Sequence, residues 1–111
     1  MTRFRVRWAE VAARDLQDIV SFIAAESPSG AAAVLDRIEK RALALETSPR
    51  RGRIGPELRD FGVHSLRELI IKPYRLIYGI VRTEVHVLAV FDARRDLHDV
   101  LMDRFIRDRT S

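Results

Sequence analysis

The chain of 111 residues contains no cysteine, which excludes disulfide bonds and metal sites built on thiolates. No apolar run reaches the roughly 18–20 residues that a membrane-spanning helix needs, and the N-terminal MTRFRVRWAE lacks the apolar segment of a secretion signal. These absences predict a cytoplasmic protein without membrane contact. The length predicts one domain, spanning residues 1–111.

Sequence motifs for common catalytic and cofactor sites are also missing. The chain has no GxxxxGKS/T or GxGxxG loop to cradle a phosphate, no HExxH or Cys/His spacing for zinc, and no recognisable serine nucleophile. Its three histidines, His64, His86 and His98, lie far apart in the sequence. The sequence therefore predicts no cofactor and no metal ion, and we interpret His86 as a structural residue on a strand face near a turn.

Arginine dominates the charged residues that are present. Lys and Arg total 20 against 16 for Asp and Glu, a net charge of +4, and Lys40 and Lys72 are the two lysines. The planar guanidinium fork suits phosphate and carboxylate groups. The excess of arginine predicts nucleic acid or an acidic protein as a partner, although a soluble domain without such a partner could have the same composition.

Residues 3–8, RFRVRW, alternate strictly between apolar and basic side chains. This alternation predicts a half-buried strand. The apolar side holds Phe4, Val6 and Trp8, and the other side holds Arg3, Arg5 and Arg7. We interpret the arginines as protection of a sheet edge, with a phosphate-reading face as the alternative.

Two helices are expected next, over residues 9–26 and 28–47, because apolar residues recur in both with helical spacing. Ser27 is the expected N-cap of the second helix, with Pro28 at its first position. The short turn between the helices predicts an antiparallel hairpin. The basic segment PRRGRIG, residues 49–55, is expected to be a loop that either contacts phosphate or has no binding role.

Three strands are expected at residues 63–72, 74–81 and 84–91, with a turn at Arg82-Thr83 between the last two. Both faces of the third strand are largely apolar, which predicts a central position in the sheet. One face is expected to hold Val85, Val87, Ala89 and Phe91, and the other Glu84, His86, Leu88 and Val90.

Helical spacing resumes near the C-terminus, where Asp96 is the expected N-cap of a final helix and Asp99 lies in its first turn. The predicted order of elements is β-α-α-β-β-β-α. We therefore predict an α+β fold in which an N-terminal strand is followed by an antiparallel helical hairpin packed on an antiparallel β-sheet, with a C-terminal helix.

Four arginines are candidates for a binding surface. Arg67 and Arg75 lie on the two strands of a predicted hairpin and could reach one sheet surface, which Arg94 and Arg95 could approach from the end of the last strand. Such a cluster would attract phosphate or the acidic side chains of a partner. The alternative is that an arginine here pairs with a nearby carboxylate such as Glu68.

The stretch SLRELIIKPYRLIYGIVRTEVHVLAVFDARRDL, residues 65–97, is similar to the C-terminal half of the RelE/ParE superfamily of bacterial toxins. The predicted element order also fits, so the resemblance covers nearly the whole chain. It implies the toxin of a type II toxin–antitoxin module, neutralised by a small antitoxin. The activities of the superfamily diverge: RelE-like toxins cut mRNA in the ribosomal A site, whereas ParE-like toxins are described as poisoning DNA gyrase.

The resemblance supplies a site for the ribonuclease alternative. Arg67 and Arg75 fall where RelE-like toxins carry basic residues on the middle strands, and Arg94 or Arg95 matches a further arginine. His98 is the nearest group able to move a proton. Cleavage of RNA by 2′-OH attack requires such a group besides charge stabilisation, because arginine stays protonated at neutral pH.

Departures from the RelE pattern favour the ParE-like branch. Leu69 stands where RelE has a second lysine, and Val100 and Leu101 stand where an aromatic acid/base is expected. ParE-like chains often read VLHGRRDL where this chain reads VFDARRDL, so Asp92 replaces a histidine and leaves the subgroup open. We therefore assign no catalytic residue, and the same four arginines stay candidates for contacts with a target or an antitoxin.

The resemblance thus implies a ParE-like toxin that inhibits growth by poisoning DNA gyrase. A cognate antitoxin is expected to neutralise it through an acidic, partly disordered arm, in a toxin–antitoxin hetero-oligomer. Two alternatives stay open: a RelE-like mRNA endoribonuclease that acts on the ribosome, and a non-toxic remnant that binds its antitoxin.

Overall fold

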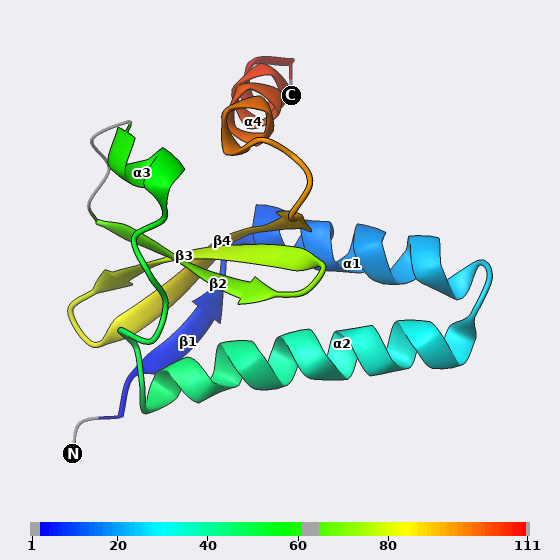
Figure 1. Ribbon diagram of the computed structural model, residues 1–111, viewed down its shortest axis with the longest axis horizontal. Helices are drawn as coiled ribbons and strands as arrows, with labels where there is room; N and C mark the ends of the chain where they lie inside the picture. Colours follow the sequence, from blue (N-terminus) through cyan, green and yellow to red (C-terminus); the bar gives the residue numbers. More distant parts are fainter. Residues whose placement is uncertain (1–2, 61–64, 111) are drawn as a thin grey trace.

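The computed structural model describes residues 3–60 and 65–110, and for residues 60, 101 and 105–110 it describes the backbone alone (Figure 1). The predicted α+β order is confirmed, with one short helix added. The elements are β1 (Arg5–Trp8), α1 (Glu10–Ala24), α2 (Pro28–Leu43), the 3-10 turn η1 (Ala44–Glu46), α3 (Pro56–Asp60), β2 (Leu66–Ile71), β3 (Tyr74–Val81), β4 (Glu84–Asp92) and α4 (Leu97–Thr110). In the described part of the chain, no helix is long and apolar enough to cross a membrane.

The four strands form one sheet in the order β1-β4-β3-β2. Strands β2, β3 and β4 are antiparallel neighbours, as predicted, and β4 lies inside the sheet, as its two apolar faces indicated. β1 instead pairs with β4 in parallel, and a parallel neighbour needs a long connection. Part of that connection is the hairpin of α1 and α2.

The helical hairpin covers one face of the sheet (Figure 1). The Ser27 hydroxyl accepts a hydrogen bond from the Gly30 N–H at 3.0 Å, so the predicted cap of α2 is confirmed. Burying apolar surface between helices and sheet is the main stabilising contribution in such a layer. This core is built from Ala12, Leu16, Ile38, Ala42, Leu45, Leu69, Ile71, Leu76, Tyr78, Val85, Val87 and Val90.

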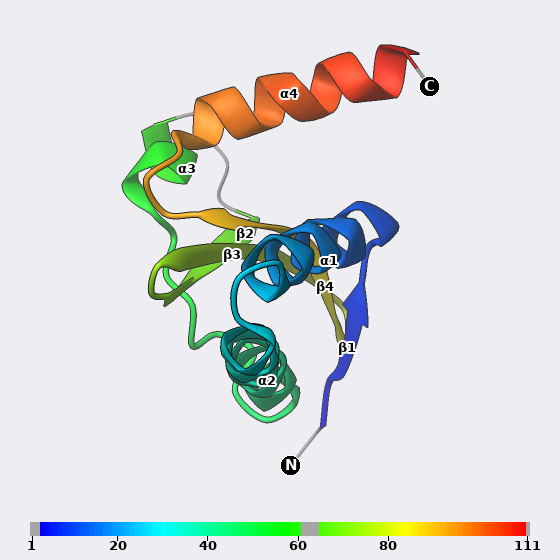
Figure 2. The same cartoon turned by 90° about the vertical axis from the view of Figure 1, so that its right-hand side faces the viewer.

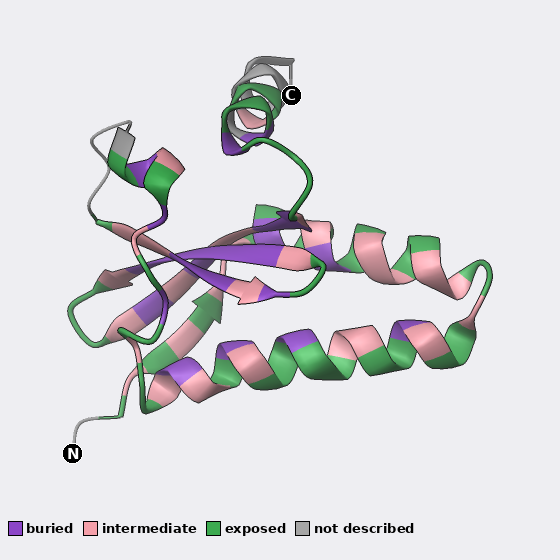
Figure 3. Ribbon diagram, in the orientation of Figure 1, coloured by how far each residue is buried: buried purple, intermediate pink, exposed green. Residues whose placement is uncertain are grey.

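A smaller core lies on the other face of the sheet, where α4 is found on the side away from α2 (Figure 2). Its buried members come from α3, the sheet and the first turns of α4: Leu58, Ile77, Phe91, Leu97 and Val100. Figure 3 shows that burial is concentrated in the middle of β2, β3 and β4. An ion pair between Arg104 and Asp15 joins α4 to α1. The sheet is therefore covered on both faces.

A β-bulge in β4 changes the predicted distribution of its side chains. The pairing of β3 with β4 shifts register midway along the strands, and one extra residue reverses the alternation beyond it. Val85 and Val87 belong to the core under the helical hairpin, whereas Phe91 belongs to the second core and Ala89 packs against that core. The prediction that these four residues share one face is therefore wrong.

Candidate functional site

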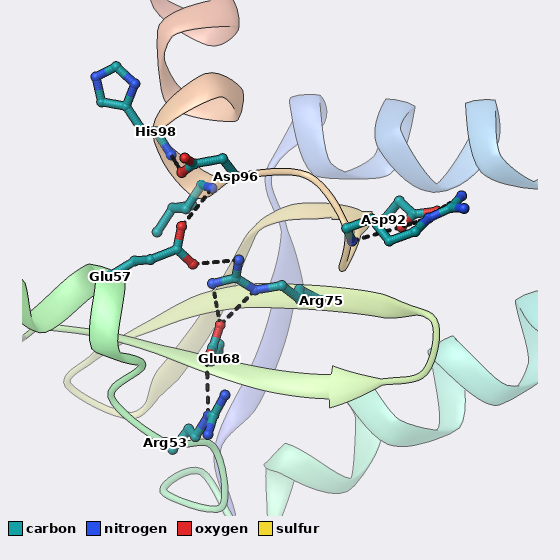
Figure 4. A network of polar contacts seen from close by, with 9 residues as sticks. Arg53, Glu57, Glu68, Arg75, Asp92, Asp96 and His98 are labelled. Carbon is teal, nitrogen blue, oxygen red and sulfur yellow. Dashed lines mark hydrogen bonds and ion pairs between the residues drawn. The ribbon is translucent and has the colours of Figure 1, made fainter.

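Arg75 lies at the centre of a buried ion-pair network (Figure 4). It donates from Nε and Nη2 to Glu68 Oε2 at 2.9 and 2.6 Å, and its Nη1 lies 2.7 Å from Glu57 Oε1. Glu68 is 2% exposed and also accepts from Arg53 Nε at 3.0 Å. The guanidinium carbon of Arg75 lies 5.2 Å from the centre of the Phe91 ring. The network joins α3, β2, β3 and the loop before α3.

The surroundings of Arg75 keep its guanidinium charged but bind it in ion pairs with Glu57 and Glu68. Burial alone would lower the pKa of Arg75, but hydrogen bonds and charge attraction from Glu68 and Glu57 outweigh it and raise the pKa. Two carboxylates already balance this cation, so an incoming phosphate would meet their repulsion. The expected alternative, pairing with Glu68, is the arrangement that the structure has.

Arg67 lies on the other face of the sheet from Arg75. In the β2–β3 register Arg67 is opposite Tyr78, whereas Arg75 is opposite Ile70 on the face that holds Glu68. Residues directly opposite each other on antiparallel strands share a face. The expectation that Arg67 and Arg75 could reach one sheet surface is therefore wrong. Arg67 instead donates from Nη1 to the Gly52 carbonyl at 2.8 Å.

The basic loop at residues 49–55 is fastened to the sheet. The Tyr78 hydroxyl donates to the Pro49 carbonyl at 2.7 Å and accepts from the Gly52 N–H at 2.8 Å. A Cβ at Gly52 would lie 2.8 Å from the Glu68 carbonyl oxygen, and one at Gly55 would collide with the Glu68 carboxylate. Only glycine permits these close approaches. Burial raises the pKa of Tyr78, although the Gly52 hydrogen bond and Arg67 oppose the shift.

Arg94 and Arg95 are exposed and lie between β4 and α4. Arg94 pairs with Asp92 at 2.9 Å, and the hydrogen bond from its side chain lowers the pKa of that carboxyl. Arg95 lies 3.6 Å from Asp103 on α4. Exposed ion pairs of this kind contribute little to stability and exchange easily for other partners. Of the four candidate arginines, these two are the most accessible to another molecule.

The beginning of α4 is held by two carboxylates. Asp96 accepts from the His98 N–H at 2.9 Å, so its predicted role as N-cap is confirmed, and this bond is the main reason that the pKa of Asp96 is lowered. Glu57 accepts from the Leu97 N–H at 2.9 Å with the oxygen that does not face Arg75. His98 is exposed near Asp99, and Figure 4 shows its ring pointing away from Arg75. The ribonuclease set of Arg67, Arg75 and His98 thus does not converge on one surface.

The role of Glu57 and the burial of the Glu68 side chain are not apparent from the sequence. Glu57 lies on α3, whose five residues are too few to show helical periodicity. His86, by contrast, has the expected place on a strand face near a turn, 3.1 Å from Glu84. Among the described residues, no group of three or more His, Asp or Glu side chains could hold a metal ion.

The described residues form a cleft beside α4 and a groove beside β2. A cleft of about 650 Å³ lies between α1 and α4, with Arg94 and Arg95 in its lining and Phe22, which is 83% exposed, at its side. A groove of about 520 Å³ lies between α2, the loop before α3 and β2, lined in part by Arg41 and Arg51.

Two solved structures share this fold. The chain superposes on a chain from the chromosomal ParDE toxin–antitoxin system of P. aeruginosa with a TM-score of 0.69 and 18% identity, covering 83% of this chain and 98% of that one. It also matches the RelBE2 toxin–antitoxin complex of Mycobacterium tuberculosis with a TM-score of 0.57 and 23% identity, covering 81% and 98%. The fold is therefore that of RelE/ParE-like proteins.

Sequence comparison identifies the family. Residues 6–97 match the family described as ParE toxin of type II toxin-antitoxin system, parDE. The protein named "Putative toxin Y4kP" from Sinorhizobium fredii (strain NBRC 101917 / NGR234) is 36% identical over 103 residues, which cover 91% of this chain and all of that protein. The chain belongs to the ParE toxin family.

Proposed function

We propose that this ParE-family toxin inhibits growth by binding and poisoning DNA gyrase in the cytoplasm, and that it does so without a catalytic residue of its own. Membership of the ParE family carries this proposal. The arrangement of the arginines supports it, because Arg75 is balanced by Glu68 and Glu57 and Arg67 is bound to Gly52 on the opposite face. Stabilising the charge of a cleaved RNA would require free cations that converge near a proton shuttle.

We further propose that Arg94 and Arg95 contribute contacts to a partner. Both are exposed, and both lie at the wall of the cleft between α1 and α4. The two arginines pair with Asp92 and Asp103. Because these ion pairs are exposed and weak, replacing their carboxylates by those of a partner costs little free energy. Acidic side chains of an antitoxin, or of gyrase, can replace those two carboxylates.

A cognate antitoxin is the second proposed partner. The similar solved structures come from toxin–antitoxin systems, and this chain has a net charge of +4. An acidic, partly disordered arm that folds on the toxin could cover both its charge and its exposed apolar side chains. We expect the two proteins to form a hetero-oligomer and a gene for a short antitoxin to lie beside the toxin gene.

A supercoiling assay with purified gyrase tests the main proposal. Added toxin is expected to inhibit supercoiling and to trap gyrase–DNA cleavage complexes. Undisturbed gyrase activity at micromolar toxin, together with cut mRNA in a toeprinting assay, would replace the proposal with ribosome-dependent cleavage. Undisturbed gyrase and intact mRNA, with no growth defect on overexpression, would indicate a non-toxic remnant.

Charge reversal tests the assigned arginines in the same assay. Arg94→Glu with Arg95→Glu is expected to raise the toxin concentration needed for half-inhibition by about tenfold or more, since rim charges steer and orient association. Arg3→Glu with Arg5→Glu is the matched control, because it changes net charge equally at exposed positions next to the N-terminus, which lies at the opposite end of the molecule from α4 in Figures 1 and 2. Equal effects of the two pairs would show that net charge alone matters.

A further inference from the structure

A band of positively charged side chains runs between α2 and the edge of β2. At one end, Arg41 from α2 and Arg51 from the loop before α3 line the groove beside Ile70. At the other end, Arg37 of α2 donates from Nη2 to the carbonyl of Lys72, the residue that follows β2, at 2.7 Å. Figure 1 shows the loop passing β2 on its way to α3. We call Arg37, Arg41, Arg51 and Lys72 the cationic band.

The cationic band keeps its charge in the part of the chain that the structure describes. None of its four members forms an ion pair there, and Asp36 on α2 pairs with Lys40 at 3.1 Å instead. Among the described residues of the groove, Glu68 is the single acid, and Arg53 and Arg75 balance its charge. The positive charges of the cationic band are therefore available to a partner.

The loop that carries Arg51 is held in place before any partner binds. Glu68 and Arg53 exchange both backbone hydrogen bonds, at 2.8 and 3.0 Å, which fixes the loop to the edge of β2. The Gly52 N–H donates to the Tyr78 hydroxyl at 2.8 Å. Because ordering a flexible loop opposes association, a loop that is already fastened loses less entropy when it binds.

We propose that the cationic band binds the phosphate backbone of duplex DNA without reading its sequence. The stretch of β2 from Glu68 to Lys72 spans about 13 Å, and over that length one strand of DNA carries about four phosphates. The cationic band supplies a cation for each of them. If the chain acts on gyrase as proposed above, the duplex is the one that gyrase holds. DNA binding itself requires neither gyrase inhibition nor toxicity.

The composition of the groove favours a duplex over a single strand. Proteins that bind single strands stack the bases on exposed aromatic side chains, and the described residues that line the groove include none. Phosphate contacts from arginine and lysine position a duplex without any contact to the bases. A second copy of the chain would instead place like charges against each other, which weakens binding.

Fluorescence anisotropy of a labelled duplex of about 20 base pairs measures the binding, with purified toxin and no gyrase present. Four phosphate contacts predict that log Kd rises with log salt concentration with a slope of about 3.6, so the affinity should fall about 150-fold between 50 and 200 mM salt. A duplex RNA, a thymidine oligonucleotide and a peptide of ten glutamates serve as competitors. Tighter binding of the RNA or the oligonucleotide, or a peptide that competes as well as the DNA, would overturn the proposal.

Variants locate the contact. Arg41→Gln with Arg51→Gln is expected to weaken duplex binding by about tenfold or more at 50 mM salt and to lower the salt slope by about 2, because two phosphate contacts are lost. Arg3→Gln with Arg5→Gln removes the same charge next to the N-terminus and should leave the slope unchanged. Equal effects of the two pairs would overturn the assignment to the cationic band.

The result is independent of the proposed function. A toxin that inhibits gyrase but does not bind the duplex at 50 mM salt would overturn DNA binding and leave gyrase inhibition in place. A toxin that binds the duplex through the cationic band but leaves gyrase undisturbed would support DNA binding and overturn gyrase inhibition.

Discussion

Replacement of Arg75 by methionine tests whether this buried guanidinium has a structural role. Methionine is long and apolar, so it keeps the space filled while it removes the charge. In the native protein the Arg75 side chain is 9% exposed and lies 2.6 Å from Glu68 and 2.7 Å from Glu57. After the substitution Glu68 keeps Arg53, at 3.0 Å, whose own side chain is 63% exposed.

The expected loss follows from the burial of Glu68, whose side chain is 1% exposed. Removing one partner of a buried ion pair costs about 3–5 kcal/mol, because the other charge stays desolvated. Arg53 relieves part of that penalty, so we expect about 3 kcal/mol, the lower end of the range. At about 4 °C per kcal/mol for a domain of this size, the Tm should fall by roughly 12 °C.

Thermal and urea unfolding followed by circular dichroism measure this loss. Arg94→Met is the control, because that side chain is 90% exposed and its removal should change stability by less than about 0.5 kcal/mol. Arg75→Met combined with Glu68→Leu removes both charges and should restore stability to within about 1 kcal/mol of the native value. If Arg75→Met unfolded at the same temperature as Arg94→Met and yet lost growth inhibition, Arg75 would be a functional contact and this reasoning would be refuted.

Substitutions at three further residues test neighbouring features. Gly55→Ala places a methyl group against the Glu68 carboxylate and should cost about 1–3 kcal/mol in urea unfolding; a neutral result would show that the loop can move away. Asp96→Ala removes the cap at the His98 amide and should cost about 1 kcal/mol, whereas Asp96→Asn should retain most of it; equal losses would contradict the capping role. Burial raises the pKa of Tyr78. The stabilisation that the neutral Tyr78 side chain gives the folded state is therefore present below the ordinary pKa of 10.0, and it is lost as pH rises through the raised value. The stability difference between the native protein and Tyr78→Phe should therefore narrow above about pH 10, and urea midpoints that run parallel to pH 11 would contradict this.

Local signals in the sequence were sufficient to predict most of the elements. Ser27 and Asp96 act at the helix starts where their residue types and positions indicated, because a cap depends on a few consecutive residues. Strand β3 has the predicted bounds, and the turn after it places Arg82 at a φ of 56°, a conformation for which the sequence offers no glycine. Such features need no knowledge of distant contacts.

The faces of Arg67 and Arg75 could not be predicted by the same means, because they depend on the length of one turn. Ile71 pairs with Tyr74, so two residues connect β2 to β3. If the turn also included Tyr74, Arg75 would pair with Ile71 instead of Ile70. Arg67 and Arg75 would then lie on the same face of the sheet. A difference of one residue in the β2–β3 register therefore decides whether Arg67 and Arg75 share a face. That Arg75 could pair with Glu68 was predictable, because the two residues are close in the sequence.

Two positions at which RelE-like toxins carry functional residues are held by buried apolar side chains in this chain. Val100, where the RelE-like branch is expected to carry an aromatic acid/base, is 4% exposed and belongs to the core beneath α4. Leu69, where RelE has a second lysine, is also 4% exposed and belongs to the core under the helical hairpin. A lysine in place of Leu69 would bury an unpaired charge, which would lower the stability of the fold. Both positions therefore contribute to the stability of the fold through apolar packing.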